Sequence, residues 1–192
     1  MAYFPAFLDF TNKRILIVGG GYVANEKLDH LLDFTSNITL VAKDYSKENM
    51  ELITKNNLKF YEKAYETSDI EGFDIVIAAI DDFDIQEKIY FDTRDKNILC
   101  NCVDLKKYCD FIFPSYVKKG ELTIAISTSG TSPALAKNLR IFLEKIIPDS
   151  IVDFIETMKE YRKTMPKGKE RMQFLDKKAR DYMEDLTKKE NS

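Results

Sequence analysis

The chain has 192 residues, 44% of them hydrophobic and 32% charged, and its formal net charge is only -3. This composition is typical of a globular protein with a sizeable core, and the small net charge argues against nucleic acid or an anionic membrane as the main partner. No apolar stretch approaches the roughly 20 residues that a membrane helix needs. Because the first residues lack a signal-peptide pattern and the three cysteines suit a reducing compartment, we expect a cytoplasmic protein.

Short apolar runs alternate with helical patterns through the first half of the chain. We predict strands at 14–18, 38–42, 58–61, 74–80 and 99–103, with helices at 23–32, 47–55 and 85–94. Such alternation predicts an α/β fold, a Rossmann-like parallel sheet with helices on both faces.

The pattern changes after Asp104. Strands at 111–114 and 122–127, joined near Lys118-Lys119-Gly120, are predicted to form an antiparallel pair. Ser132 and Pro133 then begin a helix that stops before Pro148. The remaining residues are predicted to be helical, with a break at 164–168.

The glycine-rich segment after the first strand fits the dinucleotide fingerprint G-x-G-x-x-G/A at Gly19, Gly21 and Ala24. Gly19 allows a tight turn, and Gly21 lets the backbone approach a pyrophosphate. The small Ala24 lets helix and strand pack closely. The helix that begins at Tyr22 and Val23 offers free amides to phosphate, so the segment predicts a nucleotide-binding role.

The acid that usually binds the adenine ribose should follow the second strand, where this sequence has Lys43-Asp44. Asp44 would serve one position late, whereas Lys43 would favour a 2′-phosphate. Solvated loop charges are an equally good interpretation of both residues. The motif therefore leaves NAD and NADP open.

Carboxylates follow two further strands, at the edge where ligands bind in open α/β sheets. Asp81 and Asp82 follow one strand, and they either contact a cofactor or cap the next helix. Asp104 ends the next strand beside Asn101, where a carboxylate could exchange a proton next to a nicotinamide. A turn-forming aspartate is the alternative.

A hydroxyl-rich loop, Ser127-Thr128-Ser129-Gly130-Thr131-Ser132, leads into the helix that begins at Pro133. Amides and hydroxyls in this position suit an anion such as a carboxylate. Capping by Ser132 alone is the alternative, but the loop has five hydroxyl residues, more than one cap needs. This excess favours ligand binding.

No metal site is predicted. Cys100 and Cys102 lie on one face of a strand, where free cysteine behaves as a small buried hydrophobe. The only histidine, His30, lies far away in the sequence, so a four-ligand zinc site is hard to assemble.

Several of these segments, taken in order, resemble the precorrin-2 dehydrogenase family, which is also found as the N-terminal part of siroheme synthase. The segments that carry the resemblance are 4–9, the glycine turn, 78–82, 101–104, 109–114 and 123–136. The resemblance spans about residues 2–147. Ile80, Gln86 and Leu105 depart from the residues that the family often has at these positions.

The resemblance implies oxidation of precorrin-2, a tetrapyrrole, to sirohydrochlorin with NAD as the cofactor. It implies a homodimer divided into an NAD-binding Rossmann-like domain (1–112), a dimerisation and substrate-binding region (113–147) and a helical region (148–192). Asp104 is the implied catalytic proton acceptor. From the motifs we predict cofactor binding by Gly19, Gly21, Tyr22, Val23, Ala24, Lys43, Asp81 and Asp82. We predict substrate binding by Asn101, Ser127, Thr128 and Ser129, of which the resemblance implies Ser127.

Two alternatives stay open. A bifunctional enzyme would also insert iron, and a non-catalytic protein would only sense the dinucleotide or bind the tetrapyrrole. The substrate's eight carboxylates also need nearby positive charge, for which Lys118, Lys119, Lys137 and Arg140 are the candidates.

Overall fold

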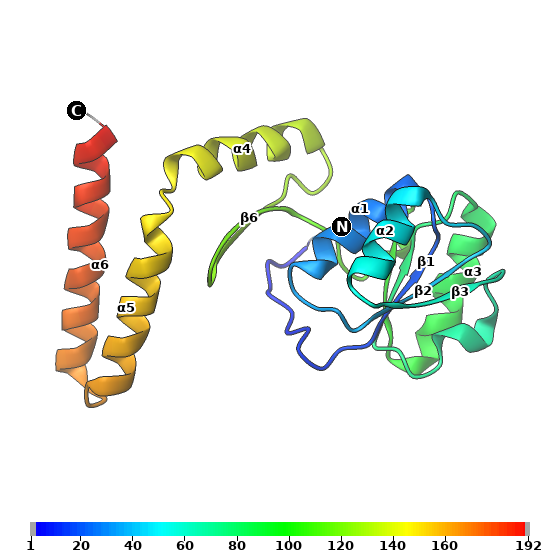
Figure 1. The fold of residues 1–192 in the computed structure, drawn as a ribbon, viewed down its shortest axis with the longest axis horizontal. Coiled ribbons are helices and arrows are strands. Elements are labelled where there is room, and N and C mark those ends of the chain that lie inside the picture. Colours follow the sequence, from blue (N-terminus) through cyan, green and yellow to red (C-terminus); the bar gives the residue numbers. More distant parts are fainter. Residues whose placement is uncertain (1–2, 191–192) are drawn as a thin grey trace. The chain divides into compact units, whose positions relative to one another are not determined.

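The computed structural model describes residues 3–190, which form two compact units. The first unit ends at Phe113 and the second begins at Pro114. Each unit is described by itself below, with the element labels of Figure 1.

The first unit is built on a five-stranded sheet of order β3-β2-β1-β4-β5, in which every neighbouring pair is parallel. The strands are β1 (Ile15–Val18), β2 (Ile38–Ala42), β3 (Lys59–Glu62), β4 (Ile75–Ala78) and β5 (Leu99–Cys102). The chain leaves β1 in one direction toward β3 and returns on its other side as β4. In open parallel sheets ligands bind at such a reversal, outside the carboxyl ends of the strands, which here are those of β1 and β4.

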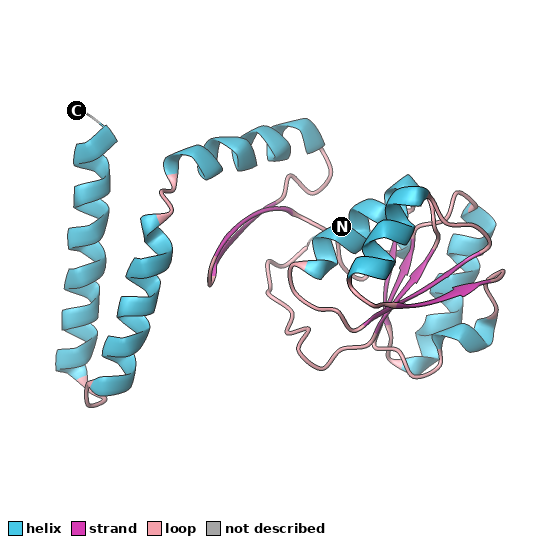
Figure 2. Cartoon of the chain, viewed as in Figure 1, coloured by secondary structure: helices cyan, strands magenta, loops and turns pink. Residues whose placement is uncertain are grey.

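Helices cover both faces of this sheet, as predicted (Figures 1 and 2). They are α1 (Tyr22–Leu32), α2 (Lys47–Lys55) and α3 (Phe83–Thr93), with short 3-10 turns at Thr67–Ile70, Arg94–Lys96 and Lys106–Tyr108. Ile15 and Ile17 pack in one core cluster with α1, whereas Leu16 and Val18 pack in the other with α3. Because both faces are covered, all four residues of β1 are buried.

The predicted strand at 111–114 is wrong, because β6 (Ser115–Lys119) begins only after it. Phe111 and Phe113 pack against the core of the first unit, which explains their apolar character without a strand. A side chain holds the backbone there instead: Nδ2 of Asn101 donates to the Phe111 carbonyl oxygen at 2.8 Å. Pro114, which has no N–H, follows directly.

The second unit contains an antiparallel pair, β6 and β7 (Leu122–Ile126), followed by α4 (Pro133–Ile146), α5 (Ser150–Thr164) and α6 (Lys169–Glu190). Ser132 caps α4 and Pro133 occupies its first turn, as predicted. Two aromatic pairs join α5 to α6: Phe154 stacks on Tyr182 with ring centroids 4.1 Å apart, and Tyr161 meets Phe174 edge-on at 5.0 Å. None of the helices within residues 3–190 is long and apolar enough to cross a membrane.

Candidate functional site

The glycine turn between β1 and α1 has little room for side chains at its first two positions. Gly19 has φ of 132°, and a Cβ there would lie 2.1 Å from the carbonyl oxygen of Ala79. A Cβ on Gly20 would lie 2.1 Å from the carbonyl oxygen of Asp44. Glycine is therefore required at both positions for the chain to turn sharply from β1 into α1.

Gly21 differs from its neighbours, because a Cβ at this position would meet nothing within 4 Å. Gly21 is the N-cap of α1, and no side chain caps the helix. The amides of Tyr22, Val23 and Ala24 thus begin a helix whose positive end is open to a ligand. An open backbone approach and uncapped amides are what a pyrophosphate needs, so these residues fit a dinucleotide.

Asn49, on α2, is hydrogen-bonded to the backbone of the glycine turn. Its Nδ2 donates to the carbonyl oxygens of Gly20 at 2.8 Å and Gly21 at 2.9 Å. The Ser46 amide also donates to the Gly20 carbonyl, at 2.8 Å. Asn49 is fully buried, and its Oδ1 has no hydrogen-bond partner among the described residues. Sequence reasoning missed Asn49, because 29 positions separate it from Gly20.

The loop after β2 carries Lys43 and Asp44, both exposed. Tyr45 anchors this loop by donating its hydroxyl to the Tyr61 carbonyl at 2.9 Å, and burial raises the pKa of Tyr45 to about 12. The phenol therefore stays protonated and keeps donating at neutral pH. Cofactor binding by Lys43 stays a prediction.

Asp82 is the N-cap of α3, where its Oδ1 accepts from the amides of Asp84 and Ile85, both at 3.1 Å. This is the capping role that the sequence left open, and it explains why α3 begins before the predicted residue 85. Asp81 is exposed at the same edge. Contact of Asp81 and Asp82 with a cofactor stays a prediction.

Asp104 follows β5 at the carboxyl edge that also carries the glycine turn, because β1, β4 and β5 are parallel neighbours. The side chain is exposed, and it makes no hydrogen bond or ion pair with any residue in the described part of the chain. A carboxylate without such partners can accept a proton from a ligand.

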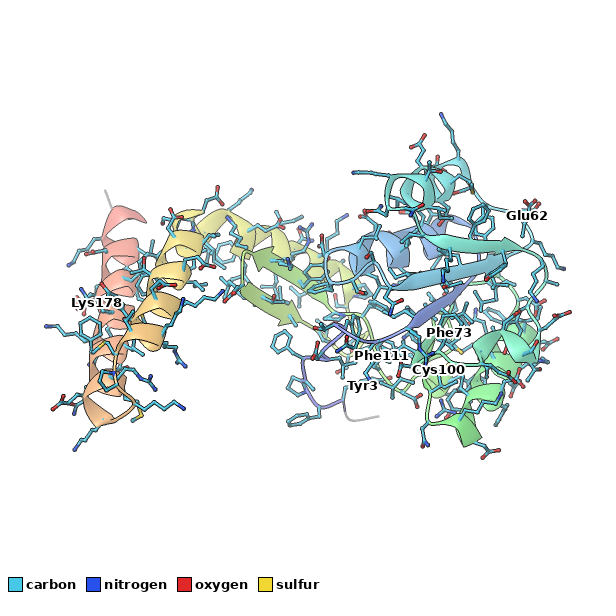
Figure 3. The ribbon with its side chains drawn as sticks, turned by 60° about the horizontal axis from the view of Figure 1, so that its bottom comes forward. Tyr3, Glu62, Phe73, Cys100, Phe111 and Lys178 are labelled. Atoms are coloured by element: carbon cyan, nitrogen blue, oxygen red, sulfur yellow. The ribbon has the colours of Figure 1, made fainter. Side chains whose placement is uncertain are left out.

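Asn101 is close to Asp104 in the sequence, but its side chain bonds to the connection between β5 and β6. It is 4% exposed, and besides Phe111 it contacts the Cys109 thiol at 3.6 Å. Cys100 and Phe111, both labelled in Figure 3, belong to the segments that Asn101 joins. The nitrogen of Asn101 thus holds the connection in place, and contact with a substrate stays a prediction.

Arg94 and Asp110 fasten the same connection to α3. Both terminal nitrogens of Arg94 donate hydrogen bonds to the Asp110 carboxylate, at 2.9 and 2.6 Å. The Arg94 guanidinium also lies 3.9 Å from the centroid of the Tyr90 ring. Asp110 also accepts from the Cys100 amide at 2.7 Å. Burial acts to raise the pKa of Asp110, but Arg94 and the Cys100 amide together hold it below its ordinary value.

We expect Asp110→Asn to destabilise the folded protein by about 2 kcal/mol at neutral pH, because Arg94 loses a charged partner. Since the folded pKa of Asp110 is lowered, its stabilisation is complete above about pH 4 and is lost as pH falls through the folded value. Urea unfolding of both proteins at about pH 7 and about pH 3 measures this. An equal difference in unfolding free energy at both pH values would contradict the assignment.

In the second unit, the hydroxyl-rich loop is shaped by its own side chains. Ser127 Oγ accepts from the Ser129 amide at 3.0 Å, and Thr128 Oγ1 accepts from the Ser132 amide at 3.0 Å. Ser132 Oγ accepts from the Leu135 amide at 3.3 Å. These bonds give three of the five hydroxyls a structural role, so the number of hydroxyls is weaker support for a ligand than the sequence suggested. Substrate binding by Ser127, Thr128 and Ser129 stays a prediction.

Lys119 and Arg140, which the sequence placed near the substrate, have structural partners. Lys119 donates to the Ile147 carbonyl at 2.7 Å and to Asp149 at 2.6 Å, which ties the hairpin to the α4–α5 connection. Arg140 pairs with Glu144 at 2.6 Å. Lys137 is exposed on α4, and its contact with the substrate stays a prediction.

The prediction that Cys100 and Cys102 are buried is confirmed, whereas Cys109 is half-buried. Cys100 and Cys102 are buried with sulfurs 3.8 Å apart, and the Cys109 thiol donates to the Cys102 carbonyl at 3.0 Å. Burial raises the pKa of Cys109, which keeps the thiol protonated. Within residues 3–190, no group of three or more His, Cys, Asp or Glu side chains is placed to hold a metal ion.

Two protein families match this chain. The model described as "Putative NAD(P)-binding" matches residues 6–115, which include the glycine turn, Asn101 and Asp104. The model described as "Sirohaem biosynthesis protein central" matches residues 119–145, which include the hydroxyl-rich loop and most of α4.

Curated relatives include siroheme synthases. The siroheme synthase of Pseudoalteromonas translucida (strain TAC 125) is 38% identical over 151 residues, which cover 79% of this chain and 32% of the relative. That of Zymomonas mobilis subsp. mobilis is 33% identical over 181 residues, which cover 92% of this chain and 38% of the relative. The chain therefore spans about a third of the length of these relatives.

Among solved structures, "SirC, precorrin-2 dehydrogenase" superposes with a TM-score of 0.78 at 23% identity. The match covers 97% of this chain and 100% of that one. The likeness shows that the two proteins share a fold.

Proposed function

Because the chain belongs to the NAD(P)-binding family that matches residues 6–115, we propose that it oxidises precorrin-2 to sirohydrochlorin with NAD as the cofactor. The observation that carries the proposal is the open backbone position at Gly21, at the edge of the sheet that Asp104 shares. The siroheme synthase relatives and the match over residues 119–145 support the choice of a tetrapyrrole as substrate.

The oxidation removes two hydrogens from precorrin-2. One of them leaves as a hydride, with the electron pair of its C–H bond, and bound NAD would supply the acceptor. The other leaves as a proton, which an Asp104 carboxylate oxygen accepts. The amides at the start of α1 hold the pyrophosphate, and Asn49 keeps the turn in the shape that this binding needs.

We also propose that the region 113–147 takes part in substrate binding. Ser127, Thr128 and Ser129 are proposed to contact the tetrapyrrole, and Lys137 to contribute positive charge to its carboxylates. Lys119 is left out of this role, because its ammonium is bonded to Ile147 and Asp149. We place the reaction in the cytoplasm, where the three free cysteines would stay reduced.

The protein is proposed to act as a homodimer through α4. Leu135, Leu139, Phe142 and Ile146 follow one another at spacings of four and three residues, and their exposed fractions lie between 39% and 57%. A continuous apolar stripe of this kind on a helix marks an interface. A second copy of the same helix would cover it.

We expect Phe142→Glu to turn the dimer into a monomer, because a charge would enter the middle of the apolar interface. Light scattering coupled to size exclusion measures the mass directly. Lys137→Glu is the control on another side of α4, and it should leave the dimer intact. A wild-type protein that is monomeric at micromolar concentration would contradict the dimer.

Anaerobic incubation with precorrin-2 and either NAD or NADP tests the function. Sirohydrochlorin absorbance should appear together with the reduced nicotinamide, in equal amounts, and only when the dinucleotide is present. Added ferrous iron distinguishes the bifunctional alternative, which would form siroheme. Absence of turnover by the folded protein with either dinucleotide would overturn the enzyme and favour the non-catalytic binding protein.

A further inference from the structure

Lys27, on α1, is a partly buried lysine that forms no ion pair with any carboxylate in the described part of the chain. Its Nζ lies 4.8 Å from the centroid of the Phe113 ring. The neighbouring Glu26 instead accepts a hydrogen bond from the Tyr22 hydroxyl at 3.1 Å. The ammonium is therefore removed from much of the solvent with no carboxylate of the described chain at ion-pair distance, although Glu26 and Asp104 lie near enough to act on it.

This arrangement is unfavourable unless something else compensates it. Burying an ammonium without a partner costs free energy, and a cation–π contact offsets only part of that cost. Burial accordingly lowers the pKa of Lys27, while the nearby Glu26, Asp104 and Cys109 act in the opposite direction. An anion from outside the protein would supply the missing partner.

The surroundings of Lys27 are fixed in place. Phe113 lies 5.6 Å from Phe111, ring centroid to ring centroid, and Asn101 holds the Phe111 carbonyl. Helix side chains lean toward the helix N-terminus, so the long stem of Lys27 reaches toward the carboxyl edge of the sheet. Asp104 lies at this edge, close enough to influence the ammonium.

We infer that Lys27 binds a carboxylate of the tetrapyrrole and thereby positions the macrocycle beside Asp104. This inference rests on the proposed function, because the anion is a side chain of the proposed substrate. The pyrophosphate of NAD is the less favoured anion, since the uncapped amides at Tyr22, Val23 and Ala24 already serve it. Lys27 lies instead between α1 and the Phe111–Phe113 connection.

Lys27→Met and Lys27→Arg test the inference in the full chain. Methionine keeps an unbranched apolar stem against Phe113 and removes the charge, whereas arginine keeps the charge. Anaerobic titration with sirohydrochlorin, followed by absorbance, gives the tetrapyrrole Kd, and titration with NADH, followed by fluorescence, gives the dinucleotide Kd. Lys55→Met is the matched control, because Lys55 is exposed at the C-terminal end of α2, at the opposite edge of the sheet.

For Lys27→Met we expect sirohydrochlorin to bind about 10- to 100-fold more weakly, with an unchanged NADH Kd. The thermal midpoint should stay the same or rise slightly, because the cost of burying the ammonium is removed. Lys27→Arg and Lys55→Met should bind both ligands like the wild type. An unchanged sirohydrochlorin Kd in folded Lys27→Met would overturn the inference, and so would a loss confined to NADH. If the wild type bound NADH but no sirohydrochlorin, the proposed function would fall, and this inference with it.

Discussion

Replacing Gly21 with alanine is expected to remove most dinucleotide binding while the fold stays intact. A Cβ at Gly21 would meet no protein atom within 4 Å, so the folded chain has room for it. The same methyl group would stand where the backbone must approach the pyrophosphate. We expect the Kd for NADH to rise at least about 10-fold, and the unfolding free energy to change by no more than about 1 kcal/mol.

Gly19→Ala is the matched comparison for this experiment. Its Cβ would lie 2.1 Å from the Ala79 carbonyl oxygen, and its φ of 132° is one that alanine rarely adopts. This variant should lose several kcal/mol of stability, on the order of the largest effects of single substitutions. Fluorescence titration with NADH and thermal melting separate the two cases. A Gly21→Ala variant with wild-type affinity would remove this turn from the cofactor site.

Asp104→Asn is expected to lower kcat by about 100- to 10,000-fold, because asparagine has the shape of the carboxylate but cannot accept the proton. Stability should hardly change, since the exposed Asp104 side chain makes no hydrogen bond or ion pair in the described chain. Binding of NADH should also persist, because the amides that we propose to hold the pyrophosphate lie on α1.

Single-turnover absorbance under anaerobic conditions measures this loss, since it separates the chemical step from product release. Asp95→Asn is the control, an exposed aspartate in the 3-10 turn after α3. A folded Asp104→Asn protein that oxidised precorrin-2 at the wild-type rate would show that another group, or water, accepts the proton.

The parts of the fold that the sequence predicted well depend on local signals. The glycine turn lies between a buried strand and an amphipathic helix, so its place at the carboxyl edge follows from the βαβ pattern. The helix at 47–55 was predicted with its observed ends, where Ser46 caps one end and Asn56 follows the other. Such signals lie within a few residues of the structure that they determine.

The features that were missed depend on contacts between distant residues. Phe111 and Phe113 suggested a strand, but they lie outside any strand and pack their side chains against the core. The spacing of apolar residues cannot distinguish these two cases. Lys119 was assigned to the substrate because of its charge, and its partner Asp149 lies 30 positions away. Lys27 was one lysine among many in a helical pattern until the structure placed Phe113 beside it.

The bond between Asn49 and the glycine turn has a consequence for how the binding site could vary among related sequences. The turn is rigid before any ligand arrives, because Asn49 and Ser46 hold its carbonyls in the free protein. We therefore expect dinucleotide binding to require little ordering of the backbone, and its affinity to depend on α2 although α2 would supply no phosphate-binding amide. A chain that kept all three glycines but lost Asn49 would retain the fingerprint while binding the dinucleotide poorly.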